Sequence, residues 1–217
     1  MPSLKLLDVH TTIGCNLSCK GCNHFSNYFA PSSKLDTDAL LRDIEVILPR
    51  LDLGRVNVIG GEPLLNPRCE EILNTCISST KSLVYLYTNG LLLHKNEDWI
   101  RKALENPRVF LRISIHLKEV EDIIKKFNHP KVLVTVHHTG QDRWFNSIKK
   151  KDNKVYPYNH NSITRSYNAC SCPNPQLYNG KLWKCPNTAY LRELLSVTEQ
   201  EDADEWQEYI VDGVPVD

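Results

Sequence analysis

Apolar runs rich in β-branched residues recur along the first two thirds of the chain, with helical patterns between them. The runs are LKLLDVHTTI, RVNVIGG, LVYLYTNG, VFLRISIHL and KVLVTVHH. Such runs are typical of strands that are buried on both faces, as in parallel sheets with crossover helices. Asp36 and Thr37 can cap the first helix, whose apolar positions have helical spacing: Leu40, Leu41, Ile44, Ile47 and Leu48. Further helices are predicted over residues 67–78, 97–104, 117–127 and 142–148.

The strand–helix repeat fades in the last third of the chain, whereas a complete eight-stranded barrel needs about 250 residues. An open sheet would fit, but the pattern favours an α/β fold in which residues 1–155 form a partial (β/α)6-like TIM barrel. Residues 156–217 are predicted to form a small C-terminal cysteine-bearing cap. The polar stretch 149–162 indicates a linker or covering loop around one short strand. In the tail, Asn179-Gly180 predicts a turn, and EQEDADEWQEYI predicts an acidic helical end.

Composition excludes several classes of protein. With 217 residues, 41% hydrophobic and 24% charged, the chain is typical of a globular protein with one large core. Lys plus Arg and Asp plus Glu are equal at 26 each, which removes the broad attraction that nucleic acid or an anionic membrane requires. No apolar run approaches the roughly 18 residues of a membrane span, and the N-terminus lacks a signal-peptide core. We therefore expect a cytoplasmic protein.

Three of the eight cysteines, Cys15, Cys19 and Cys22, lie in one loop directly after the first predicted strand. In a reducing compartment, clustered cysteines favour metal ligation over disulfides. Thiolates ligate iron-sulfur clusters with one sulfur per iron, so three cysteines leave the fourth iron open. A zinc site with His24 as the fourth ligand is the alternative, but Cys-x-His is tighter than the usual gap between zinc ligands.

The spacing C-x3-C-x2-C after the first strand resembles the radical S-adenosylmethionine (SAM) superfamily. The resemblance implies that the three thiolates hold a 4Fe-4S cluster whose open iron chelates SAM. In that family, reductive cleavage of SAM gives a 5'-deoxyadenosyl radical that abstracts hydrogen from a substrate. One departure is Gly21, where many members carry an aromatic residue, so His24 or Phe25 would pack the adenine instead.

A second motif, Gly60-Gly61-Glu62, ends the second predicted strand. By itself it is also typical of a tight turn that only ends a strand. The family uses such a turn to bind the amino group of SAM, so the resemblance makes these three residues candidates for cofactor binding. It also suggests that Asn89 and Ser114, on the third and fourth strands, contact the ribose or the methionyl carboxylate.

Polar residues gather at the strand ends, as expected at the active-site face of a barrel. His116 and His138 could act in acid–base chemistry, since imidazole titrates near neutral pH. A hydrogen-bonded pocket wall is the more common role of such histidines. His137 and Thr139 also end the fifth predicted strand.

The remaining cysteines form two groups. Cys69 and Cys76 lie seven apart on a predicted helix and are interpreted as buried small hydrophobes. Cys170, Cys172 and Cys185, around the Gly180 turn, resemble the auxiliary-cluster segment of the SPASM and twitch groups, which implies a second iron-sulfur cluster. No cysteine follows Cys185 in this sequence. The segment is therefore a relic, a three-cysteine site, or a site whose fourth ligand lies beyond the last residue.

Together these features predict a radical SAM enzyme that acts on a small-molecule or peptide substrate. An external electron donor such as flavodoxin or ferredoxin is expected as a partner, whereas a membrane or nucleic acid is not. The alternative is a non-catalytic iron-sulfur protein that transfers electrons or binds a partner. That alternative explains the cysteines but not the Gly-Gly-Glu turn.

Overall fold

The structure is a computed structural model that describes residues 1–33, 35–137, 148–157, 162, 164–165, 168, 170 and 174–216. Its strands are β1 (Ser3–Leu4), β2 (Leu7–His10), β3 (Asp52–Leu53), β4 (Arg55–Ile59), β5 (Leu83–Thr88), β6 (Val109–Ile115), β7 (Val132–Val136), β8 (Ile148–Lys151), β9 (Lys154–Pro157), β10 (Gln176–Tyr178), β11 (Lys181–Trp183) and β12 (Val214–Pro215). Its α-helices are α1 (Thr37–Ile47), α2 (Cys69–Ser79), α3 (Leu93–Glu105), α4 (Val120–Lys126), α6 (Pro186–Val197) and α7 (Asp204–Gln207). Short 3-10 helices are η1 (Ser26–Tyr28), η2 (Leu48–Arg50) and η3 (Pro63–Leu65). The chain thus has a mixed α/β fold.

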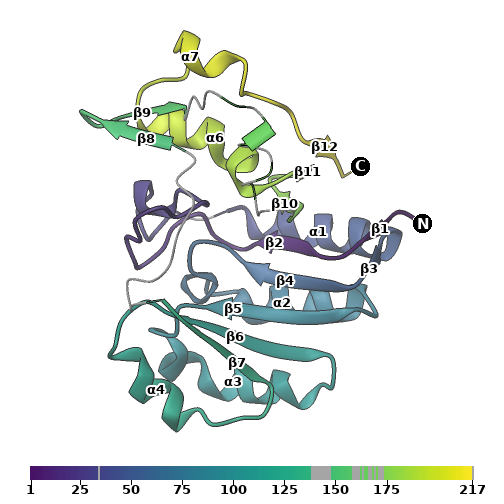
Figure 1. The fold of residues 1–217 in the computed structure, drawn as a ribbon. Helices are drawn as coiled ribbons and strands as arrows, with labels where there is room; N and C mark the ends of the chain where they lie inside the picture. The colour runs from purple at the N-terminus through teal and green to yellow at the C-terminus, as the bar shows by residue number, and fades with distance from the viewer. Residues whose placement is uncertain are drawn as a thin grey trace.

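An eight-stranded sheet organises the molecule, in the order β12-β11-β10-β2-β4-β5-β6-β7 (Figure 1). The five predicted strands, β2, β4, β5, β6 and β7, are neighbours in this sheet and are all parallel. On the other side of β2, β10 joins in parallel, while β11 and β12 continue the sheet in antiparallel fashion. The C-terminal segment therefore extends the same sheet that the N-terminal strands begin.

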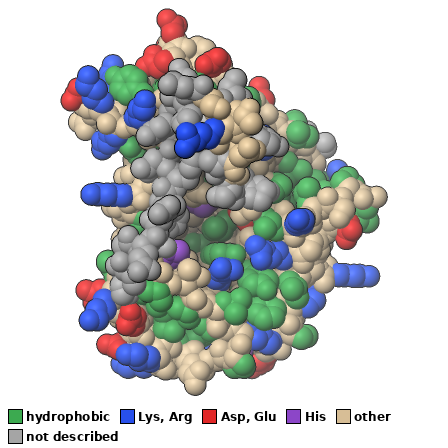
Figure 2. Space-filling view, viewed as in Figure 1, with side chains coloured by type: hydrophobic (Ala, Val, Ile, Leu, Met, Phe, Trp, Pro, Cys, Tyr) green, Lys and Arg blue, Asp and Glu red, His purple; other side chains and the backbone are tan. Residues whose placement is uncertain are grey.

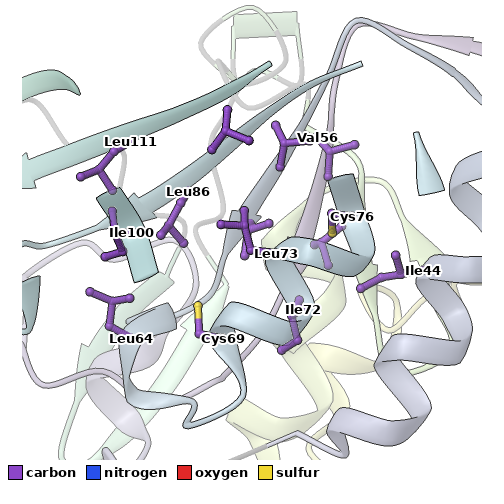
Figure 3. Close-up of a cluster of buried hydrophobic side chains, with 14 of the residues drawn as sticks. Ile44, Val56, Leu64, Cys69, Ile72, Leu73, Cys76, Leu86, Ile100 and Leu111 are labelled. Carbon is purple, nitrogen blue, oxygen red and sulfur yellow. The ribbon is translucent and has the colours of Figure 1, made fainter. Parts of the chain in front are cut away.

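Helices α1 to α4 cover one face of this sheet and bury its alternate residues (Figure 1). Helix α1 begins as predicted, because the Asp36 side chain accepts a hydrogen bond from the Ala39 amide at 3.0 Å. Figure 3 shows Leu73 of α2 beside Leu86 and other strand side chains, while Ile72 of α2 lies toward Ile44 of α1. Burial of such side chains contributes roughly 1.5–3 kcal/mol each, so this interface holds the parallel strands in place.

Cys69 and Cys76 lie in this core with exposed fractions of 2% and 0%, as the sequence predicted (Figure 3). Burial raises the pKa of the Cys76 thiol to about 12 and raises that of Cys69 as well. Both thiols are therefore protonated at neutral pH and pack as small apolar groups.

We call the opposite side of the sheet the inner face. It consists of alternate residues starting from Arg55 in β4, Leu83 in β5, Phe110 in β6 and Leu133 in β7. At the β2–β10 end it is covered by a second apolar cluster, which α6 forms with the loop after β2. Its buried members include Phe25, Tyr178, Trp183, Tyr190, Leu194 and Trp206. The inner face is thus covered at one end, whereas its residues on β5 and β6 keep partial exposure.

In the C-terminal third, one prediction is confirmed and several others differ from the structure. The Asn179-Gly180 turn is confirmed: both residues have positive φ, 50° and 70°, and they join β10 to β11 as a hairpin. The polar stretch was predicted to contain one strand, which is wrong, because β8 and β9 pair antiparallel within it. Helix α6 was not predicted, and the acidic end forms only the short helix α7. Most of the helix predicted over residues 142–148 lies outside the described residues.

Candidate functional site

A cavity of about 140 Å³ lies at the carboxyl ends of the parallel strands. Its wall includes the three predicted cluster ligands, the three residues of the glycine turn and the two predicted residues near strand ends: Cys15, Cys19, Cys22, Gly60, Gly61, Glu62, Asn89 and Ser114. Carboxyl ends of neighbouring parallel strands meet at one edge of a sheet, which explains why residues distant in sequence border one space.

Cys15, Cys19 and Cys22, which we call the cavity thiols, are half-buried in the loop after β2. The Leu17 amide donates to Cys15 Sγ at 3.4 Å, and burial raises the pKa of Cys15 to about 12. Without a metal this thiol stays protonated, so binding of iron must release its proton. Gly21 has φ of 76°, a left-handed conformation that favours glycine, and this explains the small residue before the third cysteine.

The two glycines of the Gly60-Gly61 turn let this turn pack directly against the cysteine loop. A Cβ atom on Gly60 would lie 2.5 Å from the Thr12 carbonyl oxygen, and one on Gly61 would lie 2.1 Å from the Gly14 carbonyl oxygen. The Glu62 amide also donates to Gly14 O at 3.0 Å. These contacts fix the two motifs relative to each other.

Glu62 is 1% exposed, and its carboxylate connects the end of β4 to the end of β5. Oε1 accepts from Thr88 Oγ1 at 2.7 Å and from the Leu64 amide at 3.2 Å, while Oε2 accepts from the Asn89 amide at 2.8 Å. Burial raises the pKa of Glu62 to about 7, although these three donors act in the opposite direction. A carboxylate has about four acceptor positions, so one remains for a ligand.

Asn89, directly after β5, and Ser114 of β6 border the cavity. The Asn89 side chain donates to Asn16 Oδ1 at 2.7 Å and approaches Cys15 Sγ at 3.8 Å, so it supports the cysteine loop from the far side of the cavity. Ser114 is half-buried on the inner face. Tyr87, which was not among the predicted site residues, also lines the cavity. It lies on the inner face of β5, so the alternation of side chains along this strand would have identified it.

His116 lines the cavity, and its ring stacks on His137 with centroids 4.8 Å apart. His138 and Thr139 lie outside the described residues. His116 thus forms part of the wall after β6, and His137, directly after β7, packs against it.

His24 and Phe25, the two candidates for packing the adenine, point to different places. His24 is half-buried and lines the cavity, and its buried Nε2 atom has no hydrogen-bond partner among the described residues. Burial lowers the pKa of His24 to about 4, so its ring is neutral at pH 7. Phe25 is 2% exposed in the apolar cluster under α6 and is not part of the cavity wall. Its predicted contact with the cofactor stays a prediction.

A buried polar network beneath the cysteine loop was not predicted. His10 of β2 is fully buried and hydrogen-bonds to Gln176 of β10 and Tyr190 of α6. Burial lowers the pKa of His10 to about 3, and its ring centroid lies 5.2 Å from that of His24. Asp8 accepts from Gln176 at 2.9 Å on the same face. These bonds fasten the C-terminal segment against the strand that carries the cavity thiols.

The two described tail cysteines, Cys170 and Cys185, are not part of the cavity wall. Cys170 is exposed, and Cys185 is half-buried at the N-cap of α6, with Sγ 3.8 Å from Thr188 Oγ1. Cys172 lies outside the described residues. Across the described ranges, no three His, Cys, Asp or Glu side chains are placed to hold a single metal ion.

A model of the Radical SAM superfamily matches residues 9–149, so the chain belongs to the radical SAM superfamily. Two curated relatives are GTP 3',8-cyclases, from Aquifex aeolicus (32% identical over 46% of this chain) and from Mycolicibacterium smegmatis (30% over 53%). The aligned segments cover 32% and 31% of those two proteins, so the match spans about a third of their length.

A solved structure of BtrN in complex with AdoMet and 2-DOIA shares the fold, with a TM-score of 0.59 and 16% identity. The alignment covers 95% of this chain and 84% of BtrN. The C-terminal segment is therefore included in the shared fold.

Membership of the superfamily implies a 4Fe-4S cluster and SAM. The donor set fits this group, since the three cavity thiols border one space and a cluster takes one thiolate per iron. The thiols therefore need not converge on a single ion, as zinc would require. The cavity thiols would hold the cluster, which supplies an electron for cleavage of SAM. Polar wall residues beside these thiols include Glu62, Asn89, Ser114 and His24.

Proposed function

We propose that this protein is a radical SAM enzyme that cleaves SAM reductively and abstracts hydrogen from a small-molecule or peptide substrate. The observation that carries the proposal is the common wall of one cavity. It joins the cavity thiols to the Gly60-Gly61-Glu62 turn and to Asn89 and Ser114. A site built for electron storage alone has no use for a buried carboxylate with one acceptor position left beside the thiols.

The decisive experiment is anaerobic reconstitution with iron and sulfide, followed by an assay for 5'-deoxyadenosine with a strong reductant and SAM. We expect the product to form, and to be absent when the three cavity thiols are replaced by alanine. Persistent absence of the product from the reconstituted protein would favour the alternative function, a non-catalytic iron-sulfur protein.

For the fold, we propose the partial (β/α)6-like barrel. Six consecutive parallel strands, β10-β2-β4-β5-β6-β7, and a helical layer on one face support it. A crystal structure would test whether the sheet curves around the cavity or stays open.

We also retain the proposal that Cys170, Cys172 and Cys185 hold a second, SPASM- or twitch-like iron-sulfur centre. The support is the β10–β11 hairpin, which has Gly180 at its turn and Cys185 two residues after β11. A metal crosslink would stabilise such a small segment. Iron should remain in the variant without cavity thiols and disappear when the three tail cysteines are also replaced. Complete loss of iron in the first variant would remove this proposal.

The relatives' names make GTP one candidate substrate for the assay. Because they match over only about a third of their length, GTP is a proposal to test alongside other substrates. An external donor such as flavodoxin or ferredoxin would supply the electron.

Among the described helices, none is both long and apolar enough to cross a bilayer. The proposed location is the cytoplasm, where a reducing environment keeps thiols available as ligands. Localisation of a tagged chain would test this.

A further inference from the structure

The inner face beside the cavity carries an uneven charge, although the whole chain has equal numbers of acidic and basic residues. The inner-facing positions of β4 to β7 include two arginines, Arg55 and Arg112, and no aspartate or glutamate. Both arginines are half-buried. In Figure 2, which has the same view as Figure 1, basic side chains lie among hydrophobic ones on the face in front of α2.

Neither guanidinium forms a salt bridge with a described residue. Arg112 Cζ lies 5.7 Å from the centre of the Tyr87 ring, and Arg55 Cζ lies 5.5 Å from the centre of the Tyr85 ring. Arg55 Nε is buried without a hydrogen-bond partner. Burial raises the pKa of Tyr87, and the positive charges of Arg112 and Arg55 oppose that shift. Both cations therefore act on the same region of the inner face.

Arg112 is the arginine next to the cavity. Its Cα pairs with that of Tyr87 in the β5–β6 register, and Tyr87 lines the cavity. Ser114, two residues further along β6, lines it as well. Arg55 is less available, because the buried carboxylate of Asp8 lies within electrostatic range of it. An anion that enters from the cavity would therefore meet Arg112 first.

An apolar surface adjoins these charges. The Tyr85 and Phe110 rings stack with centroids 5.0 Å apart and an interplanar angle of 15°, and both remain half-buried. Leu133 of β7, on the same face, is 40% exposed. A cationic group beside an apolar surface suits a small organic molecule with one anionic end.

We propose that the substrate is a small organic anion, with a phosphate or carboxylate that binds Arg112 and a body that lies on the Tyr85–Phe110 pair. This proposal specifies the substrate class of the proposed function. It rests on that function, because a bound anion is a substrate only if the protein is an enzyme. Arg112 would select the molecule by its charge. Arg55 would add a second positive charge deeper on the inner face.

The test uses reconstituted protein with SAM bound, so that the cofactor position is filled. Binding of tripolyphosphate and of citrate is measured by calorimetry for the wild type and for Arg112→Gln, Arg112→Lys and Arg50→Gln. Arg50 is an exposed arginine of η2 and serves as the matched control. Iron content and melting temperature of each variant show that it is folded.

We expect Arg112→Gln to weaken binding by at least about tenfold, because a charge-assisted hydrogen bond is lost. The affinity of Arg112→Lys for the anions should lie between those of the wild type and Arg112→Gln, since lysine keeps the charge but not the planar guanidinium fork. Arg50→Gln should bind like the wild type. A preference for tripolyphosphate assigns a phosphorylated substrate, and a preference for citrate assigns a carboxylate.

No binding of either anion to the wild type, or equal binding to Arg112→Gln, would overturn the proposal. Because binding requires no turnover, its failure is separate from that of the proposed function. Absence of 5'-deoxyadenosine with anion binding intact would refute only the proposed function.

Discussion

Replacement of Glu62 by glutamine tests how the cavity recognises the cosubstrate. The side chain keeps its size but loses its charge. One amide oxygen can still accept from Thr88 and Leu64, as Oε1 does at 2.7 and 3.2 Å. The new NH2 group instead faces the Asn89 amide, which donates to Oε2 at 2.8 Å. The NH2 group and the backbone N–H of Asn89 are both donors, so neither is satisfied by the other in this buried position.

Two effects follow, with different magnitudes and readouts. An unsatisfied buried amide costs about 1–3 kcal/mol of folding free energy. An ammonium group of SAM would lose a charge-assisted bond of about 1.5–3 kcal/mol, which corresponds to roughly 10- to 100-fold weaker binding. Iron content should not change, because Glu62 would pair with the ammonium group and not with iron.

The assays are titration with SAM, urea unfolding and an iron count. Glu70→Gln, the same change at an exposed position of α2, is the control and should match the wild type. Equal affinity for SAM in Glu62→Gln would refute the binding role. Loss of iron would instead indicate that the Glu62 contacts mainly hold the cysteine loop.

Three further predictions follow from the site and the core. Replacing Cys15, Cys19 and Cys22 together with alanine should remove about one cluster per chain, and wild-type iron and sulfide in that variant would refute the cluster assignment. Cys76→Ser should lower the free energy of unfolding by about 1–3 kcal/mol at unchanged iron content, because Cys76 is 0% exposed in an apolar core; loss of iron would contradict its packing role. Because the folded state raises the pKa of Glu62 from 4.5 to about 7, the folded chain binds the proton more tightly, so stability should fall by about 3 kcal/mol as pH rises across this window. Urea midpoints at pH 5 and 8 should show this slope in the wild type and not in Glu62→Gln; equal slopes would contradict it.

Local signals in the sequence predicted the parallel strands and the two short motifs that follow them. The alternation in β6 buries Val109, Leu111, Ile113 and Ile115 and leaves the residues between them half-buried. Because neighbouring side chains of a strand point to opposite faces, this pattern needs no tertiary information. The cysteine loop and the Gly60-Gly61-Glu62 turn could likewise be recognised from spacing, since each is a short contiguous motif.

Partners far apart in sequence could not be predicted. Gln176 is the register partner of Asp8 in the β10–β2 pair, and its side chain forms hydrogen bonds to Asp8 and His10. These partners are 166 residues or more apart in the sequence. No local pattern specifies that β10 adds to the free edge of β2. Tyr190 contacts His10 only because α6 folds back over the inner face. The helix had a signal, with Pro186 at its first turn and leucines at helical spacing.

Local sequence specifies the groups available to the site: three thiols in one loop and a glutamate after two glycines, each next to a segment with the pattern of a buried strand. Tertiary structure alone decided what those groups face. Glu62 connects β4 to β5, while Phe25 turns away from the cavity into an apolar cluster. Arg112 becomes a half-buried cation beside the cavity, and no described carboxylate forms a salt bridge with it. Local propensities fix which atoms a segment offers, but which atoms meet depends on strand order and on how the covering helix packs.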